Sequence, residues 1–252
     1  MKSRLVVIGS KSFIGSSIIN ISNKKLYDIV SINREHCDLS SIKSQEYLSS
    51  NIQDGDVIVF VAARAPCKDF DMFKENMNIV DNFIESVKEK KIKYILNVSS
   101  DAIYSDSNTL INEESKVLPD NTHGLMHFNR EKLLETNLKC PIGHIRPTLI
   151  FGQNDPHNGY GPNLFIRTAV ETGIIKIFGN GEEKRDHIYI EDVAKISIMM
   201  IDNMITKPIN AVSGNFISFL EIAELIKLNY NNKLEIIRTN RTIKMPHNGY
   251  RV

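Results

Sequence analysis

The stretch LVVIGSKSFIGSSIIN, residues 5–20, decides the fold expected for this chain. It begins as an apolar run, passes through a loop that holds Gly9 and Gly15, and continues with helical spacing. A strand, a glycine turn and a helix N-terminus in this order direct backbone N–H groups and the helix dipole towards a phosphate. Ser12 stands where a third glycine is common, and short glycine motifs also occur in ordinary strand-to-helix turns. The assignment of this turn as a phosphate site therefore needs support from the rest of the sequence.

The rest of the chain repeats this alternation of strand and helix. Helical spacing recurs at 13–21, 72–90 and 123–137. The expected strands are 4–8, 28–32, 56–62, 93–98 and 143–150. Strands that alternate with helices predict an α/β protein with a Rossmann-type, doubly wound parallel sheet. In such sheets ligands bind beyond the carboxyl ends of the strands, so the residues that follow each strand are the candidates for function.

The composition of the sequence changes after about residue 152. Residues 152–162 are rich in Gly, Asn, Pro and Asp and predict a loop, followed by a helix near 163–173 and a short strand around 174–178. We expect residues 1–152, with parts of 185–215, to form a dinucleotide-binding domain, and residues 153–252 to form mainly a small C-terminal lobe.

Composition limits the classes of function. The 252 residues carry 31 basic and 30 acidic side chains, a net charge of +1, so no general attraction to nucleic acid or to a membrane surface is expected. Cys37, Cys67 and Cys140 have no paired spacing, which predicts a reducing compartment and neither disulfides nor a metal site. No apolar run reaches membrane-spanning length, and we expect a cytoplasmic protein.

Several ordered motifs resemble one family. They are VIGSKSFIGS, DVIVFVAA, ENMNIVDNFIES, VSSDAIY, IRPTLIFG and, most specific, IFGNGEEKRDHIYIEDVA at 177–194. Together they resemble the extended short-chain dehydrogenase/reductases, in particular the NAD-dependent epimerase/dehydratase family that modifies nucleotide-diphosphate sugars. The resemblance implies an NAD(P)-binding domain and a substrate-binding lobe, with the nucleotide sugar between them. It also implies hydride transfer at a sugar carbon, often C4, and suggests a homodimer through a two-helix face.

The active centre departs from the family's Tyr-x-x-x-Lys pattern. The matching stretch is THGLMHFNREKLLE, which puts His123 at the tyrosine position and His127 at the lysine position. Imidazole has a pKa that suits acid–base work, so the resemblance implies His123 as acid/base and His127 as a cofactor contact. Ser100 matches the catalytic Ser/Thr. The alternative is that His123 and His127 are only polar residues near the start of a helix, in a site that has lost its redox chemistry. The pair alone supplies too few ligands for zinc.

Asp101 follows Ser100, where the family's dehydratases carry an acidic proton donor. The next family residue is glutamate, and Ala102 in its place argues against full 4,6-dehydration. Asp101 then binds substrate or caps a turn.

The resemblance also implies further contacts. Those with the cofactor are Gly9, Ser12, Phe13, Ile14, Gly15, Asn33, Arg34, Asp38, Ala62, Ala63, Asn76 and His127. Those with the substrate are Tyr104, Asn163 and Arg185. Asn33 and Arg34, rather than a carboxylate, stand directly after the second strand, so both NAD and NADP stay open. Arg185 suits a diphosphate, and its alternative role is an ion pair with a neighbouring acid.

Two functions from different classes remain after this reading. The first is an NAD(P)-dependent epimerase, dehydrogenase or ketoreductase that acts on a nucleotide sugar. The second is a family member that binds dinucleotide or nucleotide sugar without turnover.

Overall fold

The computed structural model describes residues 2–105, 110–241 and 250–251. Up to residue 111 its elements are β1 (Ser3–Ile8), α1 (Phe13–Ile21), β2 (Tyr27–Ile32), α2 (Ser44–Asn51), β3 (Val57–Phe60), α3 (Phe70–Val87), β4 (Tyr94–Val98), the short 3-10 helix η1 (Asp101–Ile103) and β5 (Leu110–Ile111). Those that follow are α4 (Thr122–Asn137), β6 (Ile142–Pro147), β7 (Leu149–Phe151), α5 (Pro162–Thr172), β8 (Ile174–Phe178), β9 (Lys184–Tyr189), α6 (Ile190–Asp202), β10 (Ile209–Ala211), β11 (Phe216–Ser218), α7 (Phe219–Tyr230), β12 (Glu235–Thr239) and β13 (Tyr250–Arg251).

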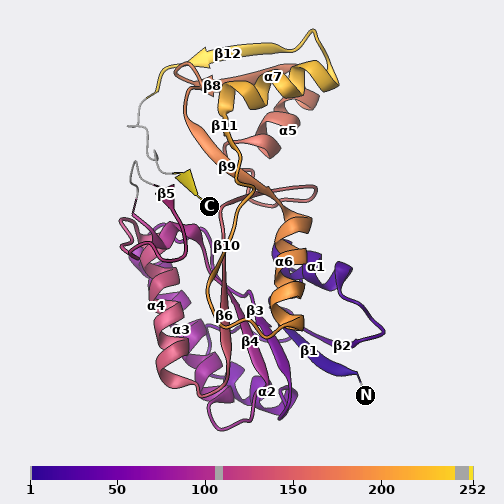
Figure 1. Cartoon of the computed structure of the whole chain (residues 1–252), viewed down its shortest axis with the longest axis vertical. Coiled ribbons are helices and arrows are strands. Elements are labelled where there is room, and N and C mark those ends of the chain that lie inside the picture. The colour runs from indigo at the N-terminus through magenta and orange to yellow at the C-terminus, as the bar shows by residue number, and fades with distance from the viewer. Residues whose placement is uncertain (1, 106–109, 242–249, 252) are drawn as a thin grey trace. The chain divides into compact units, whose positions relative to one another are not determined.

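Six strands form one parallel sheet in the order β10-β6-β4-β3-β1-β2. Figure 1 shows α1 and α6 on one face of this sheet and α2, α3 and α4 on the other. Because β1 pairs with both β2 and β3, the strand order reverses at β1, and a crevice forms at such a point beyond the carboxyl ends. The predicted Rossmann-type fold is confirmed.

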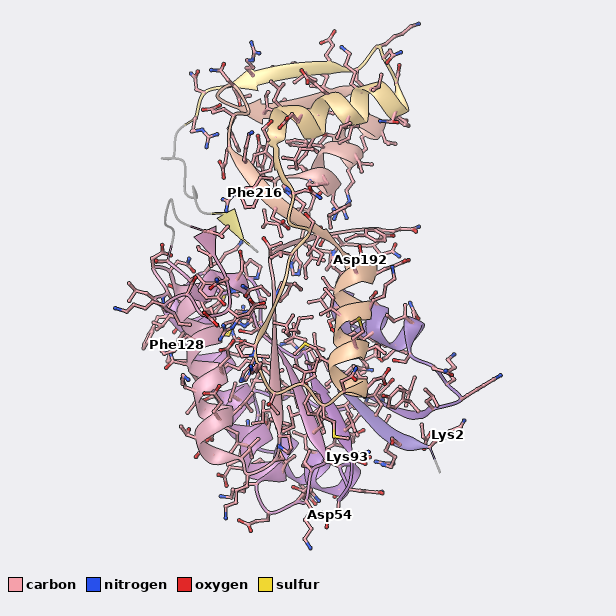
Figure 2. The ribbon with its side chains drawn as sticks, in the orientation of Figure 1. Lys2, Asp54, Lys93, Phe128, Asp192 and Phe216 are labelled. Atoms are coloured by element: carbon pink, nitrogen blue, oxygen red, sulfur yellow. The ribbon has the colours of Figure 1, made fainter. Side chains whose placement is uncertain are left out.

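The amino ends of the strands lie at the other end of the sheet from this crevice. Figure 2 labels Lys2, Asp54 and Lys93, which precede β1, β3 and β4. It also labels Phe128 on α4, the helix that carries both predicted active-site histidines. The residues that concern function therefore follow the strands, away from Lys2 and Asp54.

The strand predicted over 143–150 is wrong as a single strand. It is divided into β6, which ends at Pro147, and β7, which begins at Leu149 and belongs to a separate three-stranded sheet. Pro147 has no N–H with which to continue a ladder, and the Thr148 hydroxyl donates to the Asp186 carbonyl at 3.2 Å. The apolar run therefore changes partners within two residues.

The first core lies between the parallel sheet and helices α2, α3 and α4. Helix α3 contributes an apolar stripe with helical spacing, and the sheet contributes near-continuous apolar runs, as a sheet covered on both faces does. The fully enclosed residues at its centre are Val6, Ile8, Leu48, Ile58, Phe60, Val80, Phe83, Ile95 and Leu134.

The chain divides into two compact units. The first comprises the described residues up to Ser105 together with Glu113–Pro147 and Ile190–Ala211, so that α6 and β10 return to the parallel sheet. The second is built mainly from Thr148–Tyr189 and the residues from Val212 onward. Its own core joins α5, α7 and β8 around Phe165, Ile177 and Phe219. In the described part of the chain, no helix combines the length and the apolarity that crossing a membrane requires.

Candidate active site

The glycine turn after β1 is built for close backbone approach. Gly9 has φ +94°, and a Cβ there would lie 2.8 Å from the backbone nitrogen of Ala62, in the segment after β3. A Cβ on Gly15 would lie 2.3 Å from the Gly9 carbonyl oxygen. Contacts this short exclude a side chain, so both glycines are required by the packing of the turn itself.

Ser12 is the N-cap of helix α1. Its side chain accepts a hydrogen bond from the Gly15 N–H at 3.1 Å and caps the helix. Phe13 and Ile14 form the first turn of α1. The turn thus retains a helix N-terminus at the crevice, and it contains no acidic residue that would repel a phosphate.

The segment after β3 is held by Asn76. The Asn76 side chain is 1% exposed, accepts the Arg64 N–H at 2.8 Å and donates to the Arg64 carbonyl at 3.0 Å. It also donates to the Met72 carbonyl at 2.8 Å. Its amide therefore fixes the backbone that follows Ala62 and Ala63, which supports a cofactor crevice without requiring contact with the cofactor.

The residues after β2 form a polar edge. Asn33 accepts the Glu35 N–H at 2.9 Å. Arg34 is largely exposed and lies 3.5 Å from the Glu75 carboxylate. Asp38 accepts from both the hydroxyl and the N–H of Ser40, which holds the pKa of its carboxyl below the usual value. Asn33 and Arg34 therefore stand directly after β2, where a carboxylate would select NAD, and the carboxylates of Glu35 and Asp38 follow them.

Ser100 and Asp101 follow Ser99, the first residue after β4. The Ser100 hydroxyl accepts the Ala102 N–H at 3.2 Å and caps η1, which leaves its own proton to donate. Asp101 is the first residue of η1, and its carbonyl accepts the Tyr104 N–H at 3.1 Å. Both lie beyond the carboxyl end of the strand, where the sequence predicts them.

His123 and His127 lie one turn apart on α4. Their ring centroids are 4.7 Å apart, with the planes at 85°, so the rings meet edge to face. The Cys67 N–H donates to His123 Nδ1 at 3.3 Å. With an acceptor at Nδ1, a neutral His123 ring carries its proton on Nε2.

His127 is the more buried ring, at 5% exposure. Burial, with smaller effects from His123 and Arg130, holds the pKa of His127 well below its usual value. Its Nδ1 has no hydrogen-bond partner among the described residues. The ring is therefore neutral at pH 7 and has an unused polar atom.

Two further buried polar atoms in the crevice region lack partners among the described residues. They are the hydroxyl oxygens of Ser10, in the glycine turn, and Ser99, directly after β4. Buried polar groups are normally hydrogen-bonded, so each orphan indicates a partner that the described residues do not supply. Together with the glycine cradle, these hydroxyls and His127 Nδ1 fit a polar ligand such as a dinucleotide.

Tyr104 lies in a buried network. Its hydroxyl donates to Asn210 Oδ1 at 2.9 Å and accepts from Arg146 at 2.8 Å, while Arg146 forms a two-contact ion pair with Glu131. Tyr104 is 3% exposed, and burial raises the pKa of its phenol. In this arrangement the hydroxyl joins β6, β10 and η1, and the predicted substrate contact stays a prediction.

In the second unit, Arg185 contacts a buried acid. The Arg185 guanidinium donates to Glu183 Oε1 at 2.8 Å, and Arg241 donates to Glu183 Oε2 at 2.8 Å. Glu183 is 6% exposed, and the buried Arg241 Nε has no partner among the described residues. Two guanidinium groups thus share one carboxylate. Arg241 was not predicted from the sequence, because no local motif marks it.

Asn163, the other predicted substrate contact in this unit, lies in α5. Its amide donates to Asp155 at 2.7 Å, and its oxygen accepts the Gly152 N–H at 3.3 Å. The side chain therefore organises the 152–158 loop, and its contact with substrate remains a prediction.

The most specific sequence motif also has a structural anchor. The Asp186 carboxylate is 2% exposed and accepts the N–H groups of Ser213 and Gly214 at 2.8 and 2.7 Å. This pairing joins β9 to the segment before β11. Asp186 therefore has a structural role, and Arg185 beside it is the candidate for ligand contact.

Comparison with known proteins identifies the family. Residues 5–212 match the pattern of the NAD dependent epimerase/dehydratase family. The chain belongs to this family. In the described residues, His, Cys, Asp and Glu form no group of three or more that would hold a metal ion.

Relatives in sequence are distant and cover most of the chain. A Methanocaldococcus jannaschii protein, "Putative UDP-glucose 4-epimerase", is 25% identical over 248 residues, which cover 88% of this chain and 81% of the relative. The uncharacterized UDP-glucose epimerase YtcB of Bacillus subtilis is 22% identical over 233 residues, covering 88% and 73%.

Solved structures share the fold. UDP-glucuronic acid 4-epimerase from Bacillus cereus, in complex with NAD, has a TM-score of 0.81 at 21% identity and covers 98% of this chain and 89% of that one. The dTDP-4-dehydrorhamnose reductase from Bacillus anthracis, in complex with NADP, has a TM-score of 0.82 at 16% identity, covering 99% and 90%. The likeness extends over nearly the whole chain and includes proteins bound to either cofactor.

Proposed function

We propose that this protein binds NAD or NADP and transfers hydride at a carbon of a nucleotide-diphosphate sugar, with C4 as the expected position. The observation that carries the proposal is the set of unpartnered buried polar atoms at the crevice, on Ser10, Ser99 and His127, beside a turn that admits no side chain at Gly9 or Gly15. Family membership supports it, and the relatives named for UDP-sugar epimerisation support the substrate class.

The cofactor residues follow from the geometry of the first unit. The turn from Gly9 to Gly15 would hold the pyrophosphate, with the N-terminus of α1 behind it. Asn33, Arg34 and Asp38 would face the adenosine half of the cofactor. When bound, the nicotinamide supplies or accepts the hydride.

His123 and Ser100 would act on the sugar oxygen. Because His123 Nδ1 accepts the Cys67 N–H, the neutral ring approaches the substrate with a donor at Nε2. The Ser100 hydroxyl also has a proton to donate, since its oxygen accepts from Ala102. Two donors would stabilise the negative charge that develops on the sugar oxygen as hydride is transferred to or from its carbon. Oxidation would require His123 to release Cys67 first.

The diphosphate would bind in the second unit. Arg185 and Arg241 share Glu183, and Arg241 has an unpartnered N–H among the described residues. A diphosphate accepts charge-assisted hydrogen bonds from guanidinium groups in this way. Asn163, also in the second unit, would be a further contact with the substrate. In the first unit, Asp101 would contact the sugar.

Turnover with 4-keto and 4-hydroxy nucleotide sugars tests this assignment. With NADPH or NADH present, the wild type should oxidise the cofactor when a 4-keto sugar nucleotide is added. His123→Ala should lower turnover by roughly 10²-fold, the scale of a lost donor to an oxyanion, and His123→Gln should recover part of it. His157→Gln, at an exposed histidine of the second unit, is the matched control. Full turnover in His123→Ala would refute the role of His123.

A second candidate is a binding protein without turnover. The replacement of Tyr-x-x-x-Lys by two histidines favours it, since neither position carries the residue that the family's chemistry uses. Tight binding of cofactor and nucleotide sugar, with no change in nicotinamide absorbance under anaerobic incubation, would support this second function and contradict the first.

A further inference from the structure

Glu75, in helix α3, forms an ion-pair bridge between two arginines of the first unit. Its Oε1 lies 3.5 Å from Arg34 Nη2, and its Oε2 accepts a hydrogen bond from Arg64 Nη1. The Glu75 side chain is 19% exposed, while those of Arg34 and Arg64 are 76% and 53% exposed. Each carboxylate oxygen thus has one guanidinium partner, and both arginines reach the bridge from the surface.

The two arginines stand on either side of the glycine turn. Strand β1 lies between β2 and β3 in the sheet, and the Gly9 N–H donates to the Ile32 carbonyl at 2.8 Å. On the other side, the Ala62 N–H donates to the carbonyl of the last residue of β1 at 3.0 Å. Arg34 comes two residues after Ile32, and Arg64 two residues after Ala62. The bridge therefore connects the segments that flank the turn at the carboxyl ends of the strands.

The hydrogen bonds of Asn76 fix the place of Glu75. The Asn76 amide accepts the Arg64 N–H and donates to the Arg64 carbonyl, so α3 is attached to the segment after β3 at the residue that follows Glu75. The Arg64 backbone is therefore bound by Asn76 and its side chain by Glu75. Arg34 makes the longer of the two contacts with the carboxylate, so it is the arginine that a ligand draws away more readily.

The acidic residues next to Arg34 in the sequence have partners of their own. Glu35 forms an ion pair of 2.5 Å with Lys11. Asp38 accepts hydrogen bonds from the N–H and the hydroxyl of Ser40, which are the main cause of its low pKa, and Arg34 has only a minor effect on that pKa. The carboxylate of the bridge is therefore the one with which Arg34 forms an ion pair among the described residues.

The residues after the second strand of such a sheet meet the adenosine ribose of a dinucleotide, where an arginine accommodates a 2′-phosphate. NADP carries this phosphate, and NAD carries a hydroxyl in its place. We propose that Glu75 is a specificity-determining residue for the cofactor: it pairs with Arg34, the group that would bind a 2′-phosphate, and so favours NAD over NADP. This inference rests on the proposed function for cofactor binding, and it does not depend on hydride transfer.

Binding of NADP disrupts the pair between Arg34 and Glu75. Exposed ion pairs are weak, so a phosphate group with a charge of about −1.5 to −2 can draw the guanidinium away. The carboxylate that is left behind then repels the phosphate. Both effects lower the affinity for NADP, and neither acts on NAD, because the ribose hydroxyls of NAD are uncharged and can donate to a carboxylate.

Fluorescence titration of the cofactor-free protein with NADH and with NADPH tests the proposal. The wild type should bind NADH more tightly than NADPH. Glu75→Gln keeps the size of the side chain and removes its charge, so NADPH binding should become about tenfold tighter, while NADH binding should change by less than about threefold. A wild type that prefers NADPH, or a folded Glu75→Gln in which the ratio of the two affinities is unchanged, would overturn the proposal. The wild-type preference decides the matter if the variant does not fold.

Two further measurements separate this effect from a general change of charge. Glu85→Gln makes the same substitution near the other end of α3, where Glu85 pairs with Lys88, and should change neither affinity. In an Arg34→Ala background, Glu75→Gln should give a gain in NADPH affinity at least about threefold smaller than in the wild type, since the effect passes mainly through Arg34. Equal gains in both backgrounds would contradict the proposal.

Adenosine 2′,5′-bisphosphate and 5′-AMP test the same preference without a nicotinamide. By calorimetry, Glu75→Gln should tighten binding of the bisphosphate about tenfold relative to 5′-AMP, because the two probes differ only in the 2′-phosphate. Failure of hydride transfer in the wild type, with this shift intact, would overturn the proposed function and leave the inference standing. Saturable binding of both cofactors, with no shift in either ratio, would leave the proposed function standing and overturn the inference.

Discussion

The free energy of unfolding should fall on acidification by up to about 2 kcal/mol less in His127→Gln than in the wild type. In the native structure, burial first and then the neighbouring His123 and Arg130 hold the pKa of His127 well below its ordinary value of 6.5. In the unfolded chain the imidazole is solvated and titrates normally. Below pH 6.5 the unfolded state therefore binds a proton that the folded state does not.

The sign follows from proton uptake. Because the folded-state pKa is depressed for a base, the free energy of unfolding falls as pH drops below the unfolded value and recovers as pH rises. For one imidazole that titrates at about 6.5 when unfolded and stays neutral when folded, lowering the pH from about 7.5 to about 5.0 removes about 2 kcal/mol. Glutamine at position 127 has no proton to bind, so this part of the pH dependence disappears.

Urea unfolding followed by far-UV circular dichroism at four or more pH values measures the difference. The expected result is a wild-type curve that is steeper below pH 6.5 than that of His127→Gln, with equal slopes above pH 7.5. His157→Gln, at an exposed position, is the control and should retain the wild-type dependence. Parallel curves for the wild type and His127→Gln would show that the ring is protonated or solvated in the native state, and the reasoning would fail.

Three further substitutions have outcomes that follow from single contacts. Ser12→Ala removes the cap that receives the Gly15 N–H, and urea unfolding should show a loss of about 1 kcal/mol. Asn76→Ala removes three hydrogen bonds to the backbone of Arg64 and Met72 and should lower stability by about 2 kcal/mol, a value that an unchanged urea midpoint would contradict. Arg34→Ala should weaken NADP binding about tenfold and leave NAD binding unchanged, because a guanidinium at the end of β2 pairs with a 2′-phosphate. Equal losses for both cofactors in a fluorescence titration would show that Arg34 does not contact that phosphate.

The fold was predictable because its signals are local. The apolar runs of β1, β2 and β4 and the glycine turn lie within short windows, and the parallel sheet follows from their alternation with helices. The division between β6 and β7 was not predictable in this way. In the sequence, Pro147 and Thr148 belong to one apolar run. The break between the two strands depends on the hydrogen bond from Thr148 to the Asp186 carbonyl, which is distant in sequence.

The candidate site was predictable only where a motif marks it. His123 and His127 could be placed on one helix face from their spacing, and their rings do meet. The contact between His123 and Cys67 could not be foreseen, since it joins residues 56 positions apart through a backbone N–H. Arg130 reads as an ordinary charged residue of a helix, and only the fold shows that the guanidinium is enclosed.

Cofactor titration of two glycine variants tests the central claim most directly. Alanine at Gly15 would place its Cβ 2.3 Å from the Gly9 carbonyl oxygen, whereas alanine at Gly159 meets nothing within 4 Å. NADPH or NADH fluorescence should report saturable binding to the wild type and to Gly159→Ala, and at least about tenfold weaker binding to folded Gly15→Ala. A wild type that binds neither cofactor, or a folded Gly15→Ala that binds as tightly as the wild type, would contradict the claim that this turn holds a nicotinamide dinucleotide.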